Sequence, residues 1–500
     1  MANYKTPGVY IEEVDGFPPS VVGVDTAVPA FIGYTQKALT ERNEDLTLKP
    51  TKIFSLLEYV TYFGISQPED NGLSIKIVDN VTLKLDNAGV EVSKELVRRA
   101  IEPVFDEAQR SKHIMYYALE SYYANGGGPC YIVSVGTYTA DNTIQLGNPA
   151  ATPPVLGLQD GLTALEGEDE PTLIVFPEIT SLSAANYATL YKAALDQAEK
   201  LKDRFVIIDV RQEAVRPIDD FTAFRAANIG DSLKYGAAYY PFINTVFDYN
   251  YNGLNEATVN VVHTEIIPDG TSRPSVGADS MNTNLGALKT SNNQVYQTVK
   301  NLLTEIPLRL PPSPAIAGVY TKVDNERGVW KAPANVAVGA VTGPSVKIND
   351  NLQDLMNVDA TSGRAINAIR YIAGRGTVVW GARTLDSNSN DWRYINVRRF
   401  FNYVEESVKK ASYRFVFEPN DANTWVNMRA MIENFLSNEW RQGALQGAKP
   451  EQAFYVRVGL GQTMTIDDIN NGRLIVEIGM AVVRPAEFII LRFTQKAPEA

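Results

Sequence analysis

The stretch TLIVFPEITSLSAANYATLYKAALDQAEKLKDRFVIIDV, residues 172–210, decides the fold class. Its two ends, 172–178 and 205–210, are continuous apolar runs of strand length, which is typical of strands buried on both faces. Between these runs, apolar residues recur at helical spacing and form one stripe: Tyr187, Leu190, Tyr191, Ala194, Leu195, Ala198 and Leu201. A strand, a helix and a strand in this order predict a βαβ unit and a largely parallel sheet.

The pattern continues on both sides of this unit. A helix is expected across 219–233 and a strand at 237–243. Upstream, 65–115 is expected to be a surface elaboration, with strands followed by a charged helix in EVSKELVRRAIEPVFDEAQRSK (91–112). The segment 246–295 is rich in Asn, Thr, Ser and Gly, which favours loops. The sequence therefore predicts a multidomain α/β (α+β) protein with a mixed sheet.

Composition narrows the class of protein. The 500 residues are 45% hydrophobic, which is enough for several packed domains. No run of about 18 apolar residues occurs, and Met1 to Tyr4 lacks a signal-peptide layout, so we expect neither membrane insertion nor Sec-type export. One cysteine, Cys130, excludes an internal disulfide, and His113 and His263 are too few for a Cys/His zinc site. Cys130 begins an apolar strand, where we expect it to be buried.

Charge argues against nucleic acid as a partner. The net charge is −12, and no basic stripe with interleaved aromatic residues offsets it. The acidity is uneven, because residues 391–496 contain 14 Lys and Arg against 12 Asp and Glu, whereas the rest contains 32 against 46. This asymmetry is compatible with a C-terminal module that faces an acidic partner.

An enzyme has to be considered, because α/β sheets place their sites at the carboxyl ends of strands. Glu178 and Asp209 stand at two such ends and could hold Mg²⁺. However, the chain contains no P-loop, no dinucleotide fingerprint and no nucleophile elbow. Catalysis is therefore disfavoured, no cofactor is expected, and a metal-dependent hydrolase using these two carboxylates is kept as an alternative.

The last quarter predicts a separate α+β module. The segment 395–412 reads as an amphipathic helix, and Asn420 or Asp421 can cap a second helix. Three strand candidates follow at 452–459, 473–483 and 487–495. The third starts just after Pro485 and runs to the C-terminal end, so a strand at a free end is expected there.

The opening YKTPGVYIEEV, residues 4–14, likewise predicts a strand at a free end. Pro7 and Gly8 announce it, and the prolines of FPPSVVGV (17–24) disfavour a tight hairpin back onto it. Two readings stay open. The two terminal strands pair within their own subunit, or each completes a sheet in a neighbouring copy by β-augmentation. The second arrangement is head-to-tail and builds an open helical filament.

Five long blocks of the sequence carry a family resemblance: YKTPGVYIEEV (4–14), PPSPAIAGVYTKVDNERGVWKAPAN (311–335), WGARTLDSNSNDWRYINVRRFFNYVEESV (380–408), FEPNDANTWVNMRAMIENFL (417–436) and GRLIVEIGMAVVRPAEFIILRF (472–493). These blocks resemble the sheath protein of contractile phage tails and related contractile injection systems. The resemblance covers both ends and the whole last third. A further segment, NGGGPCYIVSVG (125–136), more weakly resembles phage-tail-like particles with toxin cargo.

The resemblance implies an architecture and a mechanism. Subunits stack as rings around an inner tube, meet baseplate and terminal cap proteins, and contract to drive the tube through a target envelope without consuming nucleotide. Assembly would occur in the bacterial cytoplasm, and the product would be part of a phage tail or of a released or cell-anchored particle. The implied domains are an N-terminal arm at 1–19, an outer α/β region at 20–390, an inner tube-facing domain at 391–483 and a C-terminal arm at 484–500.

The resemblance also implies site residues. The receiving sheet is expected to contain the strands 452–459 and 473–483, completed by arms from neighbours. The expected arm residues are Val9, Tyr10, Ile11 and Val14, with Phe488, Ile489, Ile490, Leu491 and Phe493. Exposed basic residues of the inner helices are expected to contact the tube: Arg398, Arg399, Lys409, Lys410 and Arg429. A static self-assembling shell, which would share the arms but not the motion, is the other alternative.

Overall fold

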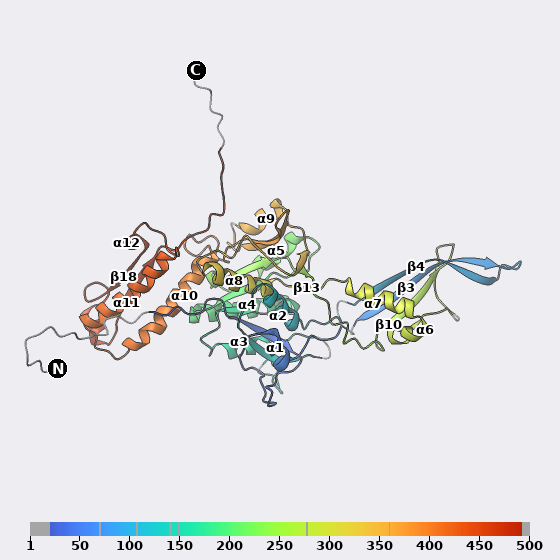
Figure 1. Cartoon of the computed structure of the whole chain (residues 1–500), viewed down its shortest axis with the longest axis horizontal. Coiled ribbons are helices and arrows are strands. Elements are labelled where there is room, and N and C mark those ends of the chain that lie inside the picture. Colours follow the sequence, from blue (N-terminus) through green and yellow to red (C-terminus); the bar gives the residue numbers. More distant parts are fainter. Residues whose placement is uncertain are drawn as a thin grey trace, which may run out of the picture. The chain divides into compact units, whose positions relative to one another are not determined.

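The computed structural model describes residues 21–69, 72–106, 109–139, 143–148, 150–276, 279–359 and 361–492. The chain divides into two compact units (Figure 1). Unit 1 comprises Met1–Val24 and Phe400–Arg484, and unit 2 comprises Asp25–Arg399 and Pro485–Ala500. Among the described residues, no helix is long and apolar enough to cross a lipid bilayer.

A nine-stranded mixed sheet forms the centre of unit 2. Its order is β14-β17-β16-β8-β7-β6-β1-β5-β2, and the five pairs from β16 to β5 are parallel. The parallel pairing of the two strands in 172–210 confirms the prediction made from that stretch. The strands are β1 (Pro29–Thr35), β2 (Thr51–Ile53), β5 (Cys130–Thr137), β6 (Leu173–Val175), β7 (Phe205–Asp209), β8 (Gly236–Tyr240), β14 (Val336–Ala337), β16 (Ile366–Ile372) and β17 (Gly376–Trp380).

Helices cover both faces of this sheet. Successive residues of β7 alternate between two hydrophobic clusters, with Val206 and Ile208 in one and Phe205 and Ile207 in the other. The first cluster includes residues of α3 (Leu158–Leu165), α4 (Ala184–Leu201) and α5 (Pro217–Ala226), and the second includes residues of α1 (Leu56–Phe63), α2 (Met115–Ala124) and α8 (Ser313–Arg327). The remaining helical segments of this region are η1 (Ile179–Ser181), η2 (Leu233–Tyr235) and α9 (Asp350–Asn357).

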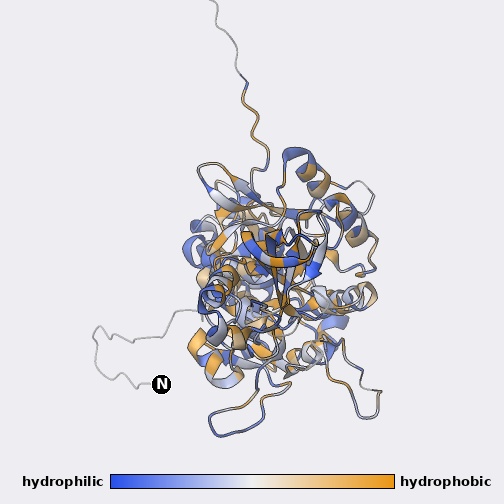
Figure 2. Ribbon diagram, turned by 90° about the vertical axis from the view of Figure 1, so that its right-hand side faces the viewer, coloured by the Kyte–Doolittle hydropathy of each residue, from blue (hydrophilic) through white to orange (hydrophobic). Residues whose placement is uncertain are grey.

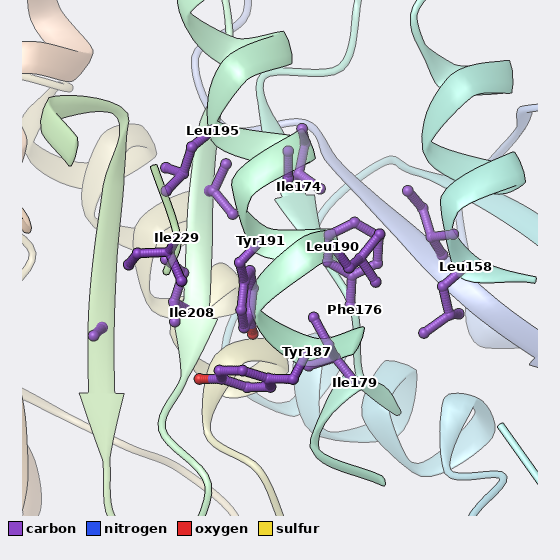
Figure 3. Packing of buried hydrophobic residues seen from close by; sticks show 14 of the residues in the cluster. Leu158, Ile174, Phe176, Ile179, Tyr187, Leu190, Tyr191, Leu195, Ile208 and Ile229 are labelled. Atoms are coloured by element: carbon purple, nitrogen blue, oxygen red, sulfur yellow. The ribbon is translucent and has the colours of Figure 1, made fainter. Parts of the chain in front are cut away.

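The predicted apolar stripe of α4 is buried in the first cluster. Figure 3 shows Tyr187, Leu190, Tyr191 and Leu195 packing toward the strand residues of this face. Six of the seven predicted stripe residues are buried, and only Leu201 at the helix end is partly exposed. Cys130 is buried, as predicted. The helix expected at 219–233 is shorter than predicted, because α5 ends at Ala226.

A second sheet, in the order β11-β10-β3-β4, with β12 paired to β10, corrects two predictions. Residues 91–105 form a strand and not a helix, and 246–295 contains ordered strands and helices and not only loops. The elements are β3 (Leu73–Leu85), β4 (Glu91–Phe105), β10 (Asn260–Ile266), β11 (Ser272–Pro274), β12 (Thr283–Asn284), α6 (Leu285–Ser291) and α7 (Asn293–Thr304).

The turn between β3 and β4 explains the first correction. The Asp86 carboxylate accepts hydrogen bonds from the N–H groups of Ala88 and Val90, and Gly89 adopts a φ of 80°. This tight turn brings β4 back along β3, and the long antiparallel ladder outweighs the helix propensity of the charged residues. The parallel partner of β3, β10, lies far away in the sequence, so local pattern could not reveal it.

A small sheet in the order β13-β9-β15 completes the strands of unit 2. It contains β9 (Ile243–Thr245), β13 (Arg309–Leu310) and β15 (Val341–Pro344), and both pairs are antiparallel.

Unit 1 has the predicted two helices and small sheet. Helix α10 (Ile395–Ser412), which begins in unit 2, matches the predicted helix 395–412, and α11 (Ala422–Arg441) is capped by Asp421 as expected. Strands β18 (Phe454–Val458) and β19 (Val476–Met480) confirm two of the three strand candidates. The other helical segments are η3 (Tyr413–Phe415), α12 (Pro450–Ala453) and α13 (Ile466–Asn470). The mixed α/β fold class is thus confirmed.

Candidate inter-subunit surfaces

Strands β18 and β19 form a two-stranded antiparallel sheet in unit 1. Val456 and Val458 are buried on the side where β18 contacts α11. Their partners on β19, Ile478 and Val476, keep part of their surface exposed. Within the described part of the chain, no third strand pairs with either outer edge. The packing of β18 on α11 supports this two-stranded sheet, and its outer edges carry backbone groups of the kind with which a further strand can pair.

Helix α11 gives this sheet a rigid support. The Asp421 carboxylate accepts hydrogen bonds from the N–H groups of Asn423 and Thr424, which satisfies the helix N-terminus. The Trp425 indole donates to the Asn420 side chain at 2.7 Å and fixes the start of the helix. The buried face contains Met428, Met431, Ile432, Phe435 and Leu436.

The predicted C-terminal arm is apolar and exposed. Phe488, Ile489, Ile490 and Leu491 have exposed fractions of 71%, 78%, 79% and 70%. Residues 484–492 contain no strand, and Figure 2 shows the apolar character of this rising segment. Such a run of exposed large apolar residues is unusual for a soluble surface and marks an interaction segment. The remaining arm residues, Val9, Tyr10, Ile11, Val14 and Phe493, lie outside the described residues.

Two of the five predicted tube-contact residues are not exposed, so that part of the expectation is wrong. Arg398 and Arg399 are buried, with exposed fractions of 2% and 3%. Arg399 pairs with the buried Asp324 at 2.6 Å and donates to the Thr26 carbonyl. The Arg398 guanidinium lies over the ring of Trp392 at 4.4 Å. Residues 395–400 at the start of α10 are all buried, so this end of the helix has no exposed face, which the pattern of charges alone did not reveal.

The other three basic residues are on the surface. Lys409 and Lys410 both reach Glu406, at 3.0 and 3.5 Å, and Arg429 pairs with Glu433 at 2.7 Å. Their side chains are 50%, 40% and 50% exposed. The Arg429–Glu433 pair is exposed on both sides, and such pairs contribute about 0.2–1 kcal/mol. The partner of the two lysines, Glu406, is itself buried, so only the lysine side of those pairs faces solvent.

Glu178 and Asp209 are both fully buried, but each is bound by a different helix. Glu178 accepts hydrogen bonds from the N–H groups of Tyr34, at 2.9 Å, and Ile114, at 3.2 Å. Since Ile114 is the N-cap of α2, this carboxylate accepts a hydrogen bond at the N-terminus of a helix. Asp209 accepts hydrogen bonds from the N–H and the hydroxyl of Ser313, the first residue of α8.

The surroundings of the two carboxyl groups change their pKa values. Burial raises the pKa of Glu178 to about 8 and that of Asp209 to about 7, although the hydrogen bonds from the helix termini oppose the rise. The oxygens are occupied by protein donors, and among the described residues no group of three or more His, Cys, Asp or Glu side chains could hold a metal ion. The arrangement is that of two structural helix caps.

Sequence reasoning missed one polar group next to the arm. Glu487 accepts hydrogen bonds from Arg383 and Asn357, and its side chain is only 21% exposed although Phe488 follows it directly. The available signal was a single acidic residue in front of the apolar run FIIL (488–491). Phe417 was also missed: it is fully exposed and has a φ of 69°, which a bulky residue rarely adopts.

The last fifth of the chain matches a known family. Residues 387–496 match the family model described as the phage tail sheath C-terminal domain. The tail sheath protein of Vibrio phage KVP40 is 26% identical over 200 residues, which cover 38% of this chain and 27% of the phage protein. The alignments span between 23% and 36% of the length of the curated relatives.

Two solved structures match over the whole chain. The helical sheath of the anti-feeding prophage in the contracted state is 31% identical, covers 99% of this chain and is covered over 100% of its own length, with a TM-score of 0.61. The sheath complex PVC of an extracellular contractile injection system, also in the contracted state, is 29% identical, with 99% of each chain covered and a TM-score of 0.60. The chain therefore belongs to the family of sheath proteins of contractile tails and contractile injection systems.

Proposed function

We propose that this chain polymerises with identical copies into a helical sheath around an inner tube and contracts to drive that tube through a target cell envelope. The observation that carries the proposal is the combination of an incomplete two-stranded sheet, β18–β19, and an exposed apolar arm, Phe488 to Leu491. The sheet has outer edges without a paired strand, and the arm has no strand to pair with within the described residues. Copies that exchange the arm would complete each other's sheets, and a head-to-tail exchange continues without closing.

The arms supply the links of the assembly. The C-terminal arm at 484–500 would add a strand to the sheet of a neighbour, where backbone hydrogen bonds bind it. The N-terminal arm at 1–19, with Val9, Tyr10, Ile11 and Val14, would add a second strand. The described chain buries little of the C-terminal arm, so strand exchange gains apolar burial that the isolated subunit lacks.

The tube would face the inner domain, 391–483, and the region 20–390 would form the outer part. Lys409, Lys410 and Arg429 are the proposed tube contacts, because their side chains are 40–50% exposed and can reach carboxylates of a partner. Arg398 and Arg399 are left out of this set because they are buried.

The proposed sheath function also implies further protein partners and a source of energy for contraction. We expect an inner tube protein, baseplate proteins and terminal caps as partners, assembly in the bacterial cytoplasm, and no catalytic activity, cofactor, nucleic acid or membrane insertion. The extended sheath would be a kinetically trapped, higher-energy assembly, and small repacking gains summed over many subunits would supply the work.

Electron microscopy of particles from producing cells tests this function. A contractile sheath gives two tube forms, one long and thin and one short and wide, whereas one diameter under every trigger would favour a static shell. The hydrolase alternative requires Mg²⁺-dependent hydrolysis by the purified chain. We expect none, because Glu178 and Asp209 already bind the termini of α2 and α8.

A further inference from the structure

Glu487 sits in a polar site at the root of the C-terminal arm. Its carboxylate accepts three hydrogen bonds from the Arg383 guanidinium, at 2.6, 2.9 and 3.2 Å, and one from the Asn357 amide at 3.0 Å. The Tyr394 hydroxyl donates a further bond at 3.3 Å. Burial would raise the pKa of Glu487, but the bonds from Arg383 and Asn357 outweigh this effect and hold the pKa below its ordinary value. The group is therefore an ionised, almost fully satisfied carboxylate.

Arg383 is itself fixed to the central sheet. The buried Asn367 of β16 accepts from the Arg383 N–H at 2.8 Å and donates to the Arg383 carbonyl at 2.8 Å. The same amide donates to the Ala238 carbonyl of β8 at 3.1 Å. The Arg383 guanidinium also donates to the Asn357 carbonyl at the end of α9. Glu487 is thus bound to the rigid centre of unit 2 and not to a mobile side chain.

The arm leaves its own subunit directly after this point. Phe488 and Ile489 line a cavity of about 560 Å³ together with Trp380 and Tyr394, yet they remain 71% and 78% exposed. The subunit's own groove therefore does not bury these side chains. The exposed fraction rises from 21% at the Glu487 side chain to 71% at Phe488, so Glu487 is the last partly buried residue in the described part of the arm.

The apolar run at the start of the arm does little to define its register. A strand with one apolar and one polar face has a preferred register, because a shift of one residue turns the wrong face to the core. The run FIIL at 488–491 is apolar on both faces, so a shifted arm would bury almost equivalent side chains. The point at which the arm is attached can therefore contribute to its register.

We propose that Glu487, held by Arg383, Asn357 and Tyr394, is the positioning residue that fixes the root of the C-terminal arm and so sets its register in the neighbour's sheet. This inference rests on the proposed exchange of the arm between copies. In this proposal, the ion pair of Glu487 with Arg383 determines which arm residue lies opposite which residue of β18 or β19.

Disulfide mapping in assembled particles tests this role. Ile490→Cys is combined with a second cysteine placed in turn at each residue of β18 and β19. A disulfide requires a Cβ–Cβ distance of about 3.5–4.5 Å, so it reports register to one residue. The native Cys130 is buried and does not compete. The series is made in the native background, in Glu487→Ala and in the control Glu166→Ala, which removes an exposed carboxylate paired with Lys200.

In the native and Glu166→Ala backgrounds, we expect one dominant cross-link between copies. In Glu487→Ala, we expect its yield to fall at least fivefold, or cross-links to spread to positions two residues away. The free subunit should still fold, with a lower thermal midpoint because Arg383 loses its carboxylate. If Glu487→Ala fails to fold, Glu487→Gln, which keeps an acceptor for Asn357 but loses the charge, decides the question.

The outcomes separate the two proposals. An unchanged dominant cross-link in Glu487→Ala or Glu487→Gln would overturn the positioning role and leave arm exchange intact. If no cross-link between copies forms at any position in the native background, arm exchange itself fails, and the positioning role fails with it.

Discussion

At the scale of single residues, Glu178 and Asp209 show what position alone can and cannot predict. The sequence places both correctly at the carboxyl ends of parallel strands, where active sites often lie. Their partners, Ile114 and Ser313, are 64 and 104 residues away and are brought to them only by the packing of α2 and α8. A carboxylate at the end of a strand can bind a metal ion or cap a helix, and only the tertiary structure shows which of the two it does.

The buried carboxyls predict a pH dependence of stability. Both pKa values are raised in the folded chain, to about 8 for Glu178 and about 7 for Asp209, so between about pH 5 and 8 the folded chain binds more protons than the unfolded chain. The free energy of unfolding of unit 2 should therefore fall as the pH rises through this window, by at most about 1.4 kcal/mol per pH unit and group.

Urea denaturation at pH 5, 6, 7 and 8 measures this slope. Glu178→Gln should make it shallower, whereas the exposed control Glu213→Gln should not change it. A wild-type stability that rises from pH 5 to pH 8 would contradict the assignment.

Because Arg399 forms a buried ion pair, we expect its substitution to lower the free energy of unfolding strongly. An exposed tube-contact residue would have little effect on stability. Arg399→Ala would leave the Asp324 carboxylate, 3% exposed, without its cation at 2.6 Å, and would remove the guanidinium from the Tyr320 ring at 4.6 Å. We expect the free energy of unfolding to fall by about 3–5 kcal/mol.

The comparison is with Arg429→Ala, which removes a pair exposed on both sides and should cost less than about 0.5 kcal/mol. Thermal and urea unfolding of both variants checks the difference. Equal, small losses would mean that Arg399 is not the buried anchor described above.

At the scale of elements, helices with an apolar stripe could be predicted and long-range strand pairing could not. The stripe from Tyr187 to Ala198 and the capped helix after Asp421 carry local signals, and both were found. Strand β4 carries the residues of a charged helix and becomes a strand only through β3. The third strand candidate, 487–495, has the composition of a strand, but within the described residues it has no strand to pair with.

The close contact between α2 and α8 predicts that adding one methyl group, by Gly318→Ala, destabilises the chain. Gly318 of α8 lies so close to α2 that a Cβ there would be 2.5 Å from the Tyr122 carbonyl oxygen and 2.8 Å from Asn125 Cβ. The clash involves backbone, so the helices would have to separate, and Gly318→Ala should destabilise the chain by about 1–3 kcal/mol.

Gly286→Ala is the matched control, because Gly286 also lies in a helix, α6, and its nearest neighbour would be 3.5 Å away. That substitution should be neutral or stabilise by up to about 1 kcal/mol, since alanine favours the helix. Thermal melting of the two variants gives the sign directly. A neutral Gly318→Ala would show that α2 and α8 are not packed this closely.

At the scale of the whole molecule, the sequence suggests how copies assemble more directly than the structure of a single subunit does. Both ends have the composition of strands, which suggested exchange between copies or pairing within one subunit. The described C-terminal arm pairs with no strand of its own chain as far as residue 492. This observation favours exchange, but the receiving edge and the register depend on a neighbour, so neither can be read from one chain. The polar root at Glu487 was missed because its partner Arg383 is 104 residues away.

The last prediction concerns the arms themselves. A chain truncated after Glu487 keeps the ion pair with Arg383 and every strand and helix described here, so it should remain a folded subunit with a nearly unchanged thermal midpoint. Because it lacks Phe488 to Leu491, it should not form a sheath, and a chain without residues 1–16 should fail in the same way. Removing only residues 497–500 (APEA), which contain no strand-forming residues, is the control and should leave assembly intact. Electron microscopy counts the particles and circular dichroism checks the fold. Intact contractile particles from either arm deletion would mean that copies are held together by surfaces other than exchanged strands.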